Sequence, residues 1–435
     1  MKNSLLIQNY IDNYRWLQKK GLAHHDIVIE KLADPETVIN KKKYICFCSN
    51  NYLGLSKRPE VIKAAQNALI KHGIGTCESR RLGGNLDVLE KLEDTISKYK
   101  NSEDTITFAT GLMANVGAIS ALTDIDFYTK LFYGKTFKKN PPETLIVGDE
   151  LNHWSIRMGI KLSRANFIKY RHNDVNHLSD ILKNNKNKIL FIITDSVFSM
   201  DGDIAHLDKI SELSQKYRAA VMIDDAHGTG VWGKTGRGIA EHFSVSDKIE
   251  IKMGTLSKAF GGLGGFVSAK KEVVDMMKIN ASTYYFTSGL PADEAAGLIE
   301  TIRIADKEPR LRKQLWKNVD RFLTGLIKIG ANVPHRYSQI IPVIIGNEKK
   351  AFEIESYLYK NGIICNAVGG PAVARGNERI RCTINATHTE NQIDYFIDVF
   401  DDIIKKFKLQ KFKVSESEFQ TFKNSAADYI KKFLE

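Results

Sequence analysis

The sequence predicts an α/β fold with a mostly parallel central sheet and a smaller C-terminal α+β domain. Two apolar runs of strand length, residues 189–195 and 219–224, flank a helical segment at 207–217. Continuous apolar runs are typical of strands buried on both faces, and alternating strands and helices are typical of a parallel sheet. A chain of 435 residues is long enough for a large core and two domains.

The composition indicates a globular protein of the cytoplasm. Hydrophobic residues make up 43% of the chain and charged residues 26%. No apolar run approaches the roughly 20 residues that span a bilayer, and the N-terminus lacks the apolar region of a secretory signal. The cysteines are too few and too scattered for a disulfide framework, and we expect buried free thiols at Cys46, Cys48, Cys77, Cys365 and Cys382.

The net charge of +12 is compatible with nucleic acid, an anionic membrane or acidic small molecules as partners. The sequence has neither zinc-finger spacing nor an RNA-binding aromatic signature, so we expect no nucleic-acid partner and no metal. The lysines are spread along the chain, which is typical of a solvated surface and would also suit an acidic partner. The tail at 409–435 is basic and amphipathic, and a solvated helix is favoured there over peripheral contact with a membrane or a partner.

Periodicity predicts the remaining elements. Apolar residues recur near helical spacing within residues 1–30, which predicts an amphipathic helix. Residues 44–48 predict a short strand, residues 60–71 a helix and residues 144–149 a buried strand. One long helix is expected to run to about residue 330, before strands of the smaller domain at 340–345 and 380–384.

One lysine lies between a strand pattern at 249–251 and a run of glycines. Lys258 could bond covalently to an aldehyde cofactor if its surroundings lower its pKa. Thr255 and Ser257 are short hydroxyl donors suited to a phosphate group, and the glycines allow close approach of the backbone. A surface Ser-Lys pair is the ordinary alternative for this stretch taken alone.

Two acidic residues and a histidine follow the strand at 219–224. Ligands of open α/β sheets bind at the carboxyl ends of the strands. Asp224 could pair there with the protonated nitrogen of a pyridine ring, and His227 could reach the same ligand. Alone, the segment fits a helix N-cap with a structural histidine, but Asp-x-x-His followed about 30 residues later by Ser-Lys is more specific.

A helix is predicted to open within residues 108–115. The backbone N–H groups of Gly111 and Leu112 at its N-terminus would suit a phosphate, because such groups lack helical partners and the helix dipole favours an anion. An ordinary helix capped by threonine is the alternative, and the two interpretations are compatible.

Five segments resemble the α-oxoamine synthases, a pyridoxal-phosphate (PLP) family with the aspartate-aminotransferase fold, which is PLP-dependent fold type I. They appear in the family's order and span most of the chain from about residue 45 to 400, at 49–55, 149–153, 197–203, 224–230 and 253–265. The resemblance implies PLP as the cofactor and a mostly parallel sheet with a smaller C-terminal domain.

The resemblance also implies roles around the cofactor. Lys258 would hold PLP covalently, Asp224 would pair with the ring nitrogen and His153 would stack on the ring. His227 and Ser199 would contact the ring oxygen. A lone histidine at 153 would more often be structural, but the surrounding matches favour the cofactor role.

Substrate and subunit contacts are implied in the same way. Asn50 and Arg381 would orient the amino acid, with Arg381 forked onto its carboxylate, a planar bidentate task that suits guanidinium. The alternative for Asn50 is an ordinary turn asparagine, and the alternative for Arg381 is a surface ion pair. Thr287 would reach the cofactor phosphate of the partner subunit, which implies a homodimer with active sites at the interface.

The implied reaction is a PLP-dependent decarboxylative condensation of an α-amino acid with an acyl thioester, from CoA or an acyl carrier protein, to give an α-aminoketone. An aminotransferase or a retro-Claisen aminoketone lyase of the same fold is the alternative. A scaffold without chemistry is disfavoured because the lysine, the aspartate and both histidines are present.

The expected organisation has four parts: an N-terminal helix and strand segment at 1–55, a PLP-binding domain at 56–295, a small C-terminal domain at 296–408 and the tail at 409–435. The loop at 73–84 departs from the family pattern. Residues 124–143 form an aromatic, basic insertion that could be a lid, a docking patch or an ordinary hairpin. Pimeloyl and long fatty acyl donors therefore both remain open.

Overall fold

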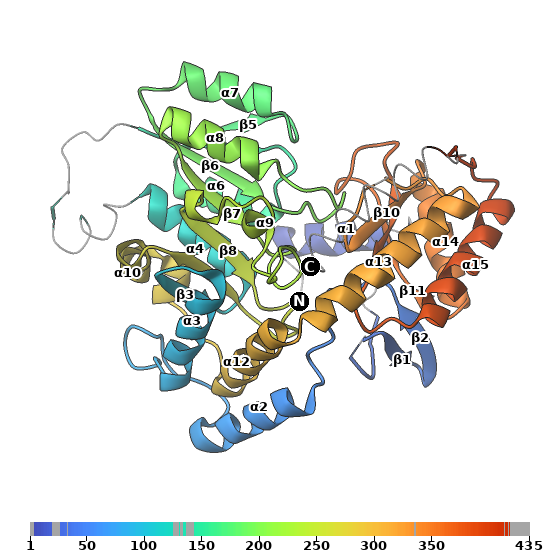
Figure 1. Cartoon of the computed structure of the whole chain (residues 1–435), viewed down its shortest axis with the longest axis horizontal. Helices are drawn as coiled ribbons and strands as arrows, with labels where there is room; N and C mark the ends of the chain where they lie inside the picture. Colours follow the sequence, from blue (N-terminus) through green and yellow to red (C-terminus); the bar gives the residue numbers. More distant parts are fainter. Residues whose placement is uncertain are drawn as a thin grey trace.

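The computed structural model describes residues 4–19, 27–32, 34–124, 130, 134–135, 143–334, 336–412, 414–415 and 417. Most of the insertion predicted at 124–143 and of the tail predicted at 409–435 lies outside the described residues. Figure 1 shows two lobes, a larger one built around a β-sheet and a smaller one formed mostly by the C-terminal part of the chain, in orange and red.

The larger lobe is organised around a seven-stranded sheet in the order β3-β9-β8-β7-β6-β4-β5. In chain order these strands are β3 (Asp104–Phe108), β4 (Thr144–Asp149), β5 (Asn166–Tyr170), β6 (Ile189–Asp195), β7 (Ala220–Asp224), β8 (Ile251–Thr255) and β9 (Gly265–Ala269). β9 pairs antiparallel with β3 and β8, whereas β5, β4, β6, β7 and β8 pair in parallel. The predicted α/β fold with a mostly parallel sheet is confirmed.

Successive residues of the central strands enter two different cores. Phe191 and Met222 belong to one apolar cluster, whereas their neighbours Ile192 and Val221 belong to the other. A strand covered on both faces needs apolar residues at every position, which explains the continuous run at 189–195.

Helices cover both faces of this sheet. One apolar cluster includes residues of α4 (Gly111–Thr123), α6 (Trp154–Ser163) and α10 (Lys271–Asn280). The other includes residues of α3 (Asp87–Lys100), α7 (Val175–Asn184), α8 (Leu207–Tyr217) and α12 (Ala292–Lys307), and α2 (Pro59–His72) packs on α12. The short helices of this lobe are α9 (Ile239–His242), η1 (Ser246–Lys248) and α11 (Ser282–Tyr285).

Polar residues gather at the edge of the sheet where the parallel strands end. Asp149, Asp195 and Asp224 are the last residues of β4, β6 and β7, and Thr255 ends β8. Since the carboxyl ends of parallel strands meet at one edge, these four residues lie along the same edge of the sheet.

Within the described part of the chain, the smaller lobe contains two three-stranded sheets and three helices. One sheet consists of β10 (Ile340–Ile344), β12 (Asn366–Val368) and β13 (Arg379–Thr383), and the other of β1 (Glu36–Ile39), β2 (Lys42–Cys46) and β11 (Ile363–Ile364). The helices are α13 (Pro309–Ile329), α14 (Glu348–Lys360) and α15 (Glu390–Lys406). Because β2 pairs with β11, the strands near the N-terminus are part of this lobe.

Three local expectations were wrong. The helix predicted to run to residue 330 is two helices, because Pro309 supplies no backbone N–H and restricts Glu308, which has φ −115° and ψ 72°. The strand before the lysine starts at Ile251 and continues to Thr255, two residues later than its predicted start. Cys77 is exposed rather than buried, since it lies in a surface loop with φ +56°.

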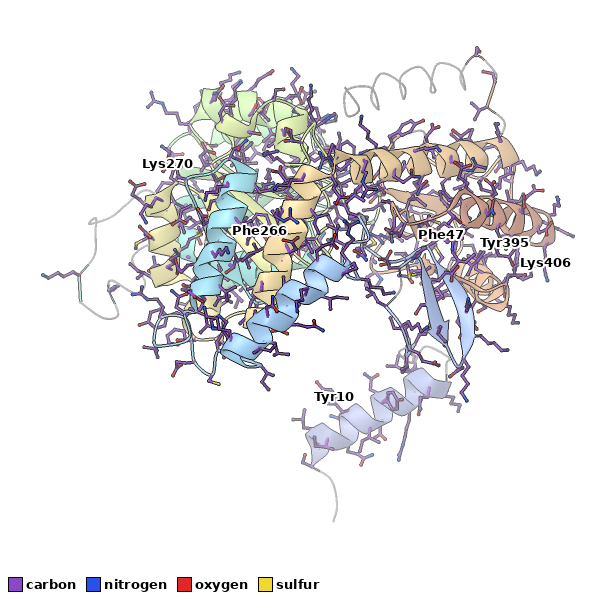
Figure 2. The ribbon with its side chains drawn as sticks, turned by 60° about the horizontal axis from the view of Figure 1, so that its bottom comes forward. Tyr10, Phe47, Phe266, Lys270, Tyr395 and Lys406 are labelled. Atoms are coloured by element: carbon purple, nitrogen blue, oxygen red, sulfur yellow. The ribbon has the colours of Figure 1, made fainter. Side chains whose placement is uncertain are left out.

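The helix predicted within residues 1–30 is α1 (Leu5–Lys19), and it buries none of its residues. Leu5 is 78% and Tyr10 73% exposed. Figure 2 shows α1, with Tyr10 labelled, lying apart from both lobes. Among the residues that the structure describes, no helix combines the length and apolar character needed to cross a bilayer.

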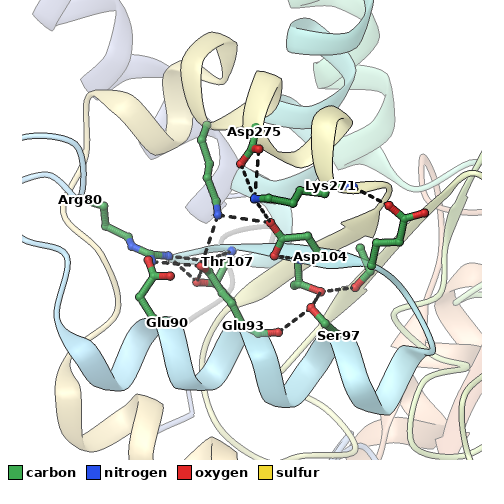
Figure 3. Close-up of polar contacts among 12 residues, drawn as sticks. Arg80, Glu90, Glu93, Ser97, Asp104, Thr107, Lys271 and Asp275 are labelled. Carbon is green, nitrogen blue, oxygen red and sulfur yellow. Dashed lines mark hydrogen bonds and ion pairs between the residues drawn. The ribbon is translucent and has the colours of Figure 1, made fainter.

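An ion cluster anchors the loop that departs from the family pattern. Arg80 is 5% exposed and pairs with Glu93 on α3, and its Nη1 donates to Thr107 Oγ1 at 3.0 Å (Figure 3). The neighbouring Ser79 forms a β-bridge with Ser288. The cluster therefore ties this loop to the segment that carries the predicted phosphate donor Thr287.

Candidate active site

A cavity of about 310 Å³ opens at the carboxyl ends of the parallel strands. Nine of the residues predicted to bind the cofactor line it: Gly111, Leu112, His153, Ser199, Asp224, His227, Thr255, Ser257 and Lys258. The chain therefore brings to one place residues that are up to 147 positions apart in sequence, from 111 to 258. Asn50, Thr287 and Arg381 do not line the cavity.

The lysine lies beside a buried histidine. Lys258 Nζ is 2.7 Å from His227 Nε2, and His227 Nδ1 is 2.6 Å from the hydroxyl of Tyr52. Gln339 Nε2 donates to the backbone carbonyl of His227 at 2.6 Å. These contacts fix the ring of His227, and the ring in turn fixes the direction of the amine.

Burial governs the electrostatics of this pair. Desolvation lowers the pKa of Lys258 from 10.5 to about 8, against the opposing charge of Asp224. Desolvation and the charge of Lys258 also hold the pKa of His227 well below its usual value. A neutral amine next to a neutral imidazole is therefore accessible near neutral pH, which is the form that attacks an aldehyde.

The carboxylate at the end of β7 is held by two donors. Asn115 Nδ2 donates to Asp224 Oδ2 at 2.7 Å, and the backbone N–H of Ala226 donates to Oδ1 at 3.0 Å. Burial and the charge of Asp224 raise the pKa of the neighbouring Asp195 well above its usual value. Asp195 Oδ2 accepts from the backbone N–H of His153 at 2.6 Å, which places this histidine at the cavity wall.

Another part of the cavity wall provides hydroxyl and amide donors. Helix α4 begins at Gly111, and its N-cap Thr110 accepts from the backbone N–H of Met113 at 3.2 Å. Thr255 Oγ1 and Ser257 Oγ lie 2.8 Å apart beside this helix end. A Cβ at Gly265 would lie 2.6 Å from the Cα of Gly111, so glycine is required for β9 to pass the helix start.

The predicted substrate residues lie just outside the cavity. Arg381, on β13, is buried, and its Nε donates to the backbone carbonyl of Ser199 at 2.6 Å. Asn50 Oδ1 accepts from the Tyr52 hydroxyl at 3.3 Å. Thr287 follows α11 beside the Ser79–Ser288 bridge and does not line the cavity of its own chain. The roles assigned to all three stay predictions.

Three polar residues of the site did not stand out in the sequence. Asn115, Ser155 and Asp195 line the cavity, and Asn115 Oδ1 is buried with no partner among the described residues. Asn115 follows Gly111 by four residues on α4, so the two share a helix face. That spacing is the signal from which Asn115 could have been found.

The donor set fits PLP. An amine with a lowered pKa suits the aldehyde, a fixed carboxylate suits the ring nitrogen, and a helix N-terminus with two hydroxyl groups suits the phosphate. The cavity contains these three features at separate positions of its wall. Among the described residues, no cluster of histidine, cysteine and carboxylate side chains could hold a metal ion.

Comparisons with known proteins show the family to which the chain belongs. The family model for aminotransferase class I and II matches residues 42–400. The 8-amino-7-oxononanoate synthase of Treponema denticola is 37% identical over 393 residues, 90% of this chain and 95% of that protein. The synthase of the same name from Petrotoga mobilis is 39% identical over 393 residues, 89% of this chain and 95% of that protein.

A solved structure of a PLP-containing enzyme is also similar to this chain. The structure of SPT, which is serine palmitoyltransferase, with PLP superposes with a TM-score of 0.85 at 29% identity and covers 94% of this chain and 100% of that one. The family match, the two relatives and this structure all cover the strands that build the cavity. The chain thus belongs to the aminotransferase class I and II family and is an α-oxoamine synthase, a PLP-dependent enzyme that condenses an α-amino acid with an acyl thioester, with loss of CO2, to give an α-aminoketone.

Proposed function

We propose that Lys258 attaches PLP, that Asp224 pairs with the ring nitrogen and that the start of α4 binds the phosphate. The observation that carries this assignment is the presence of all three features in one cavity of about 310 Å³. PLP, when bound, supplies an aldehyde that joins covalently to amines and a ring that withdraws electrons from the adjacent carbon.

In this proposal Asp224 keeps a proton on the ring nitrogen. Its two oxygens are already fixed by Asn115 and by the backbone N–H of Ala226, so the charge needs little rearrangement during the reaction. Preorganised charges of this kind are often the largest single contribution to catalysis.

Lys258 would move the proton at Cα of the amino acid. A general base works best when its pKa lies near the working pH, and burial lowers the pKa of this amine to about 8. His227 directs the amine, and Ser199 adds a hydroxyl at the cavity wall. Arg381, whose Nε contacts Ser199, would bind the carboxylate of the amino acid.

The lowered pKa predicts how PLP attachment depends on pH. The rate at which PLP joins the cofactor-free protein is expected to rise with pH and to level off above about 8, because only the neutral amine of Lys258 attacks the aldehyde. Stopped-flow absorbance at a series of pH values measures this rate. A midpoint near 10.5, the value of an ordinary lysine, would show that the cavity does not lower the pKa.

For the substrates, we propose alanine and a seven-carbon acyl thioester that ends in a carboxylate. The product for which the relatives are named carries its amine on C8 and its ketone on C7. Loss of CO2 from alanine supplies the C8–C9 fragment, and the acyl group supplies the remaining carbons. Serine with a long fatty acyl thioester is the second candidate, favoured by the similarity to SPT and by Leu112 and Leu263, which line the cavity and are 44% and 47% exposed.

A product screen tests this proposal. The PLP-loaded enzyme is mixed with each amino acid and with acyl thioesters of CoA or a carrier protein, and thiol release and product mass are measured. We expect thiol release only when both substrates are present, and the highest kcat/KM with alanine and the seven-carbon diacid. The seven-carbon acyl thioester that lacks the terminal carboxylate should give a lower kcat/KM. A preference for serine and palmitoyl thioester would select the second candidate, and keto-acid formation without a thioester would contradict both.

We also propose that the enzyme is a homodimer in the cytoplasm. Helix α1 buries none of its residues, and Ile62 and Ile70 on α2 are 45% and 85% exposed, so apolar surface is available for a second copy. Thr287 does not line the cavity of its own chain, which leaves it available to the partner's site. The five cysteines are free, which supports a reducing compartment.

Subunit complementation tests the dimer. Inactive Lys258→Ala chains and weakened Thr287→Ala chains are expected to regain activity when they are unfolded and refolded together, because a mixed dimer has one site with both residues intact. Each variant refolded alone is the control. A mixture no more active than the sum of its parts would argue against sharing of the site.

A further inference from the structure

A hairpin at residues 197–204 connects the cavity to the smaller lobe. Val197 and Ile204 form its β-bridge, and the backbone N–H of Phe198 donates to the carbonyl of Asp203 at 2.9 Å. Its tip carries Ser199, which lines the cavity. A shift of this hairpin would therefore move a side chain at the cofactor.

The smaller lobe holds the same hairpin through two arginines of β13. Arg381 Nε donates to the carbonyl of Ser199 at 2.6 Å. Arg379 Nη1 donates to the carbonyl of Met200 at 3.0 Å and pairs with Asp201 at 2.7 Å. The position of Arg381, the proposed carboxylate binder, is thus coupled to the position of the hairpin.

On its other side the hairpin is held by a histidine of the larger lobe. His172 follows β5, and its Nε2 lies 2.7 Å from Asp203 Oδ2 while its Nδ1 lies 3.0 Å from Asp149 Oδ1. The ring also packs edge-on against Phe198, with centroids 4.5 Å apart. One imidazole therefore bridges the end of β4 and the base of the hairpin.

Hydrogen-bond chemistry identifies the charge of this imidazole. A neutral ring has one N–H, but both ring nitrogens face carboxylate oxygens, and only the doubly protonated ring can donate to both. Burial opposes the charge, but the hydrogen bonds to Asp149 and Asp203 outweigh it and raise the pKa of His172 to about 10. His172 is therefore a cation at neutral pH.

The surroundings of the cation complete the cluster. Arg336 Nη1 lies 3.7 Å from Asp203 Oδ2, and Asn173 Nδ2 donates to the same oxygen at 3.0 Å. Glu150 Oε1 accepts from the backbone N–H of His172 at 3.0 Å. With His172 neutral, Asp149 and Asp203 would face the ring without the cation that joins them.

We propose that His172 is a positioning residue of the condensation reaction: as a cation it fixes the hairpin so that Ser199 faces the cofactor and the carbonyl of Ser199 holds Arg381 in place. This inference rests on the proposed roles of Ser199 and Arg381. Neither His172 nor Asp203 lines the cavity, so an effect of His172 on substrate binding is indirect, and the exchange of the hairpin shows whether it passes through the hairpin rather than through Asp149 at the end of β4.

The test compares the variants His172→Gln, Asp203→Asn and their combination. His177→Gln is the matched control, because the ring of His177 accepts from the backbone N–H of Arg171 and, among the described residues, has no hydrogen bond or ion pair with the hairpin. Each holoenzyme is assayed for KM with the amino acid and with the acyl thioester. Hydrogen–deuterium exchange of residues 197–204 is measured with PLP and after its removal, and does not depend on activity.

Loss of a hydrogen bond to a charged group predicts that His172→Gln raises the KM for the amino acid about tenfold to a hundredfold, with a much smaller change in the KM for the thioester. Exchange in the hairpin should speed up in both forms. The double variant should recover part of both losses, because Asp203→Asn removes the carboxylate that has lost the imidazolium at 2.7 Å.

An unchanged amino-acid KM with unchanged hairpin exchange would overturn the proposal. A fall in thermal stability with both KM values unaltered would also overturn it, since that is the result of a purely structural role. If His172→Gln does not fold, Asp203→Asn alone must show faster hairpin exchange and a raised amino-acid KM, or the proposal fails. The variant Arg381→Lys separates the proposed role of Arg381 from that of His172. An unaffected amino-acid KM in this variant would refute the role of Arg381. Hairpin exchange in the His172 variants would still test the role of His172.

Discussion

Replacing Lys258 with alanine is expected to abolish turnover. The variant loses both the amine that attaches PLP and the base that moves the proton at Cα, and removal of such a group lowers kcat by at least about 10⁴-fold. The visible absorption of lysine-bound PLP should also disappear. Absorption spectra and steady-state thiol release measure the two losses in one sample.

Lys252 provides the matched control. It is on β8, the strand that precedes Lys258, and burial and the charge of Lys100 lower its pKa to about 8, but it does not line the cavity. Lys252→Met should therefore keep the visible absorption band and most of the activity. Loss of the band in Lys252→Met and its survival in Lys258→Ala would reverse the assignment of the cofactor lysine.

Replacing Asp224 with asparagine is expected to lower kcat by about 10²–10³-fold, the effect of removing one preorganised electrostatic group. The amide keeps the size of the side chain, and the phosphate end of the cavity is untouched, so the protein should still bind PLP. The visible spectrum and the PLP dissociation constant test binding, and single-turnover rates test the chemistry.

Replacing the adjacent Asp225 is expected to lower stability instead. Its carboxylate is buried, pairs with Lys100 at 3.0 Å and accepts from Ser196 at 2.6 Å. Asp225→Asn would leave the buried Lys100 without its counter-charge, which predicts a loss of about 3–5 kcal/mol in the free energy of unfolding. Equal effects of the two substitutions on stability, with no specific loss of chemistry in Asp224→Asn, would contradict the role given to Asp224.

Much of the fold could be predicted because the sheet is buried on both faces. The predicted strand at 189–195 and the helix at 207–217 agree with β6 and α8 to the residue. A strand between two apolar layers has an unambiguous pattern, and its carboxyl end marks the ligand edge. The lysine, the aspartate and the histidine at this edge could therefore be predicted from the sequence.

The contacts around these residues could not be predicted in the same way. Tyr52 reaches His227 across 175 positions and Gln339 reaches it across 112, and no local pattern encodes such contacts. Pro309 is a local signal for a helix break, which the prediction of a single long helix did not include. The contacts of His172 likewise depend on tertiary packing, because its two carboxylate partners are 23 and 31 positions away.

The most direct test of the whole account is to find where the cofactor is attached. The holoenzyme is treated with borohydride, which makes the bond between PLP and an amine permanent, and is then digested and analysed by mass spectrometry. The account predicts PLP on the peptide that contains Lys258 and on no other peptide. PLP on another lysine, with Lys258 unmodified, would contradict it.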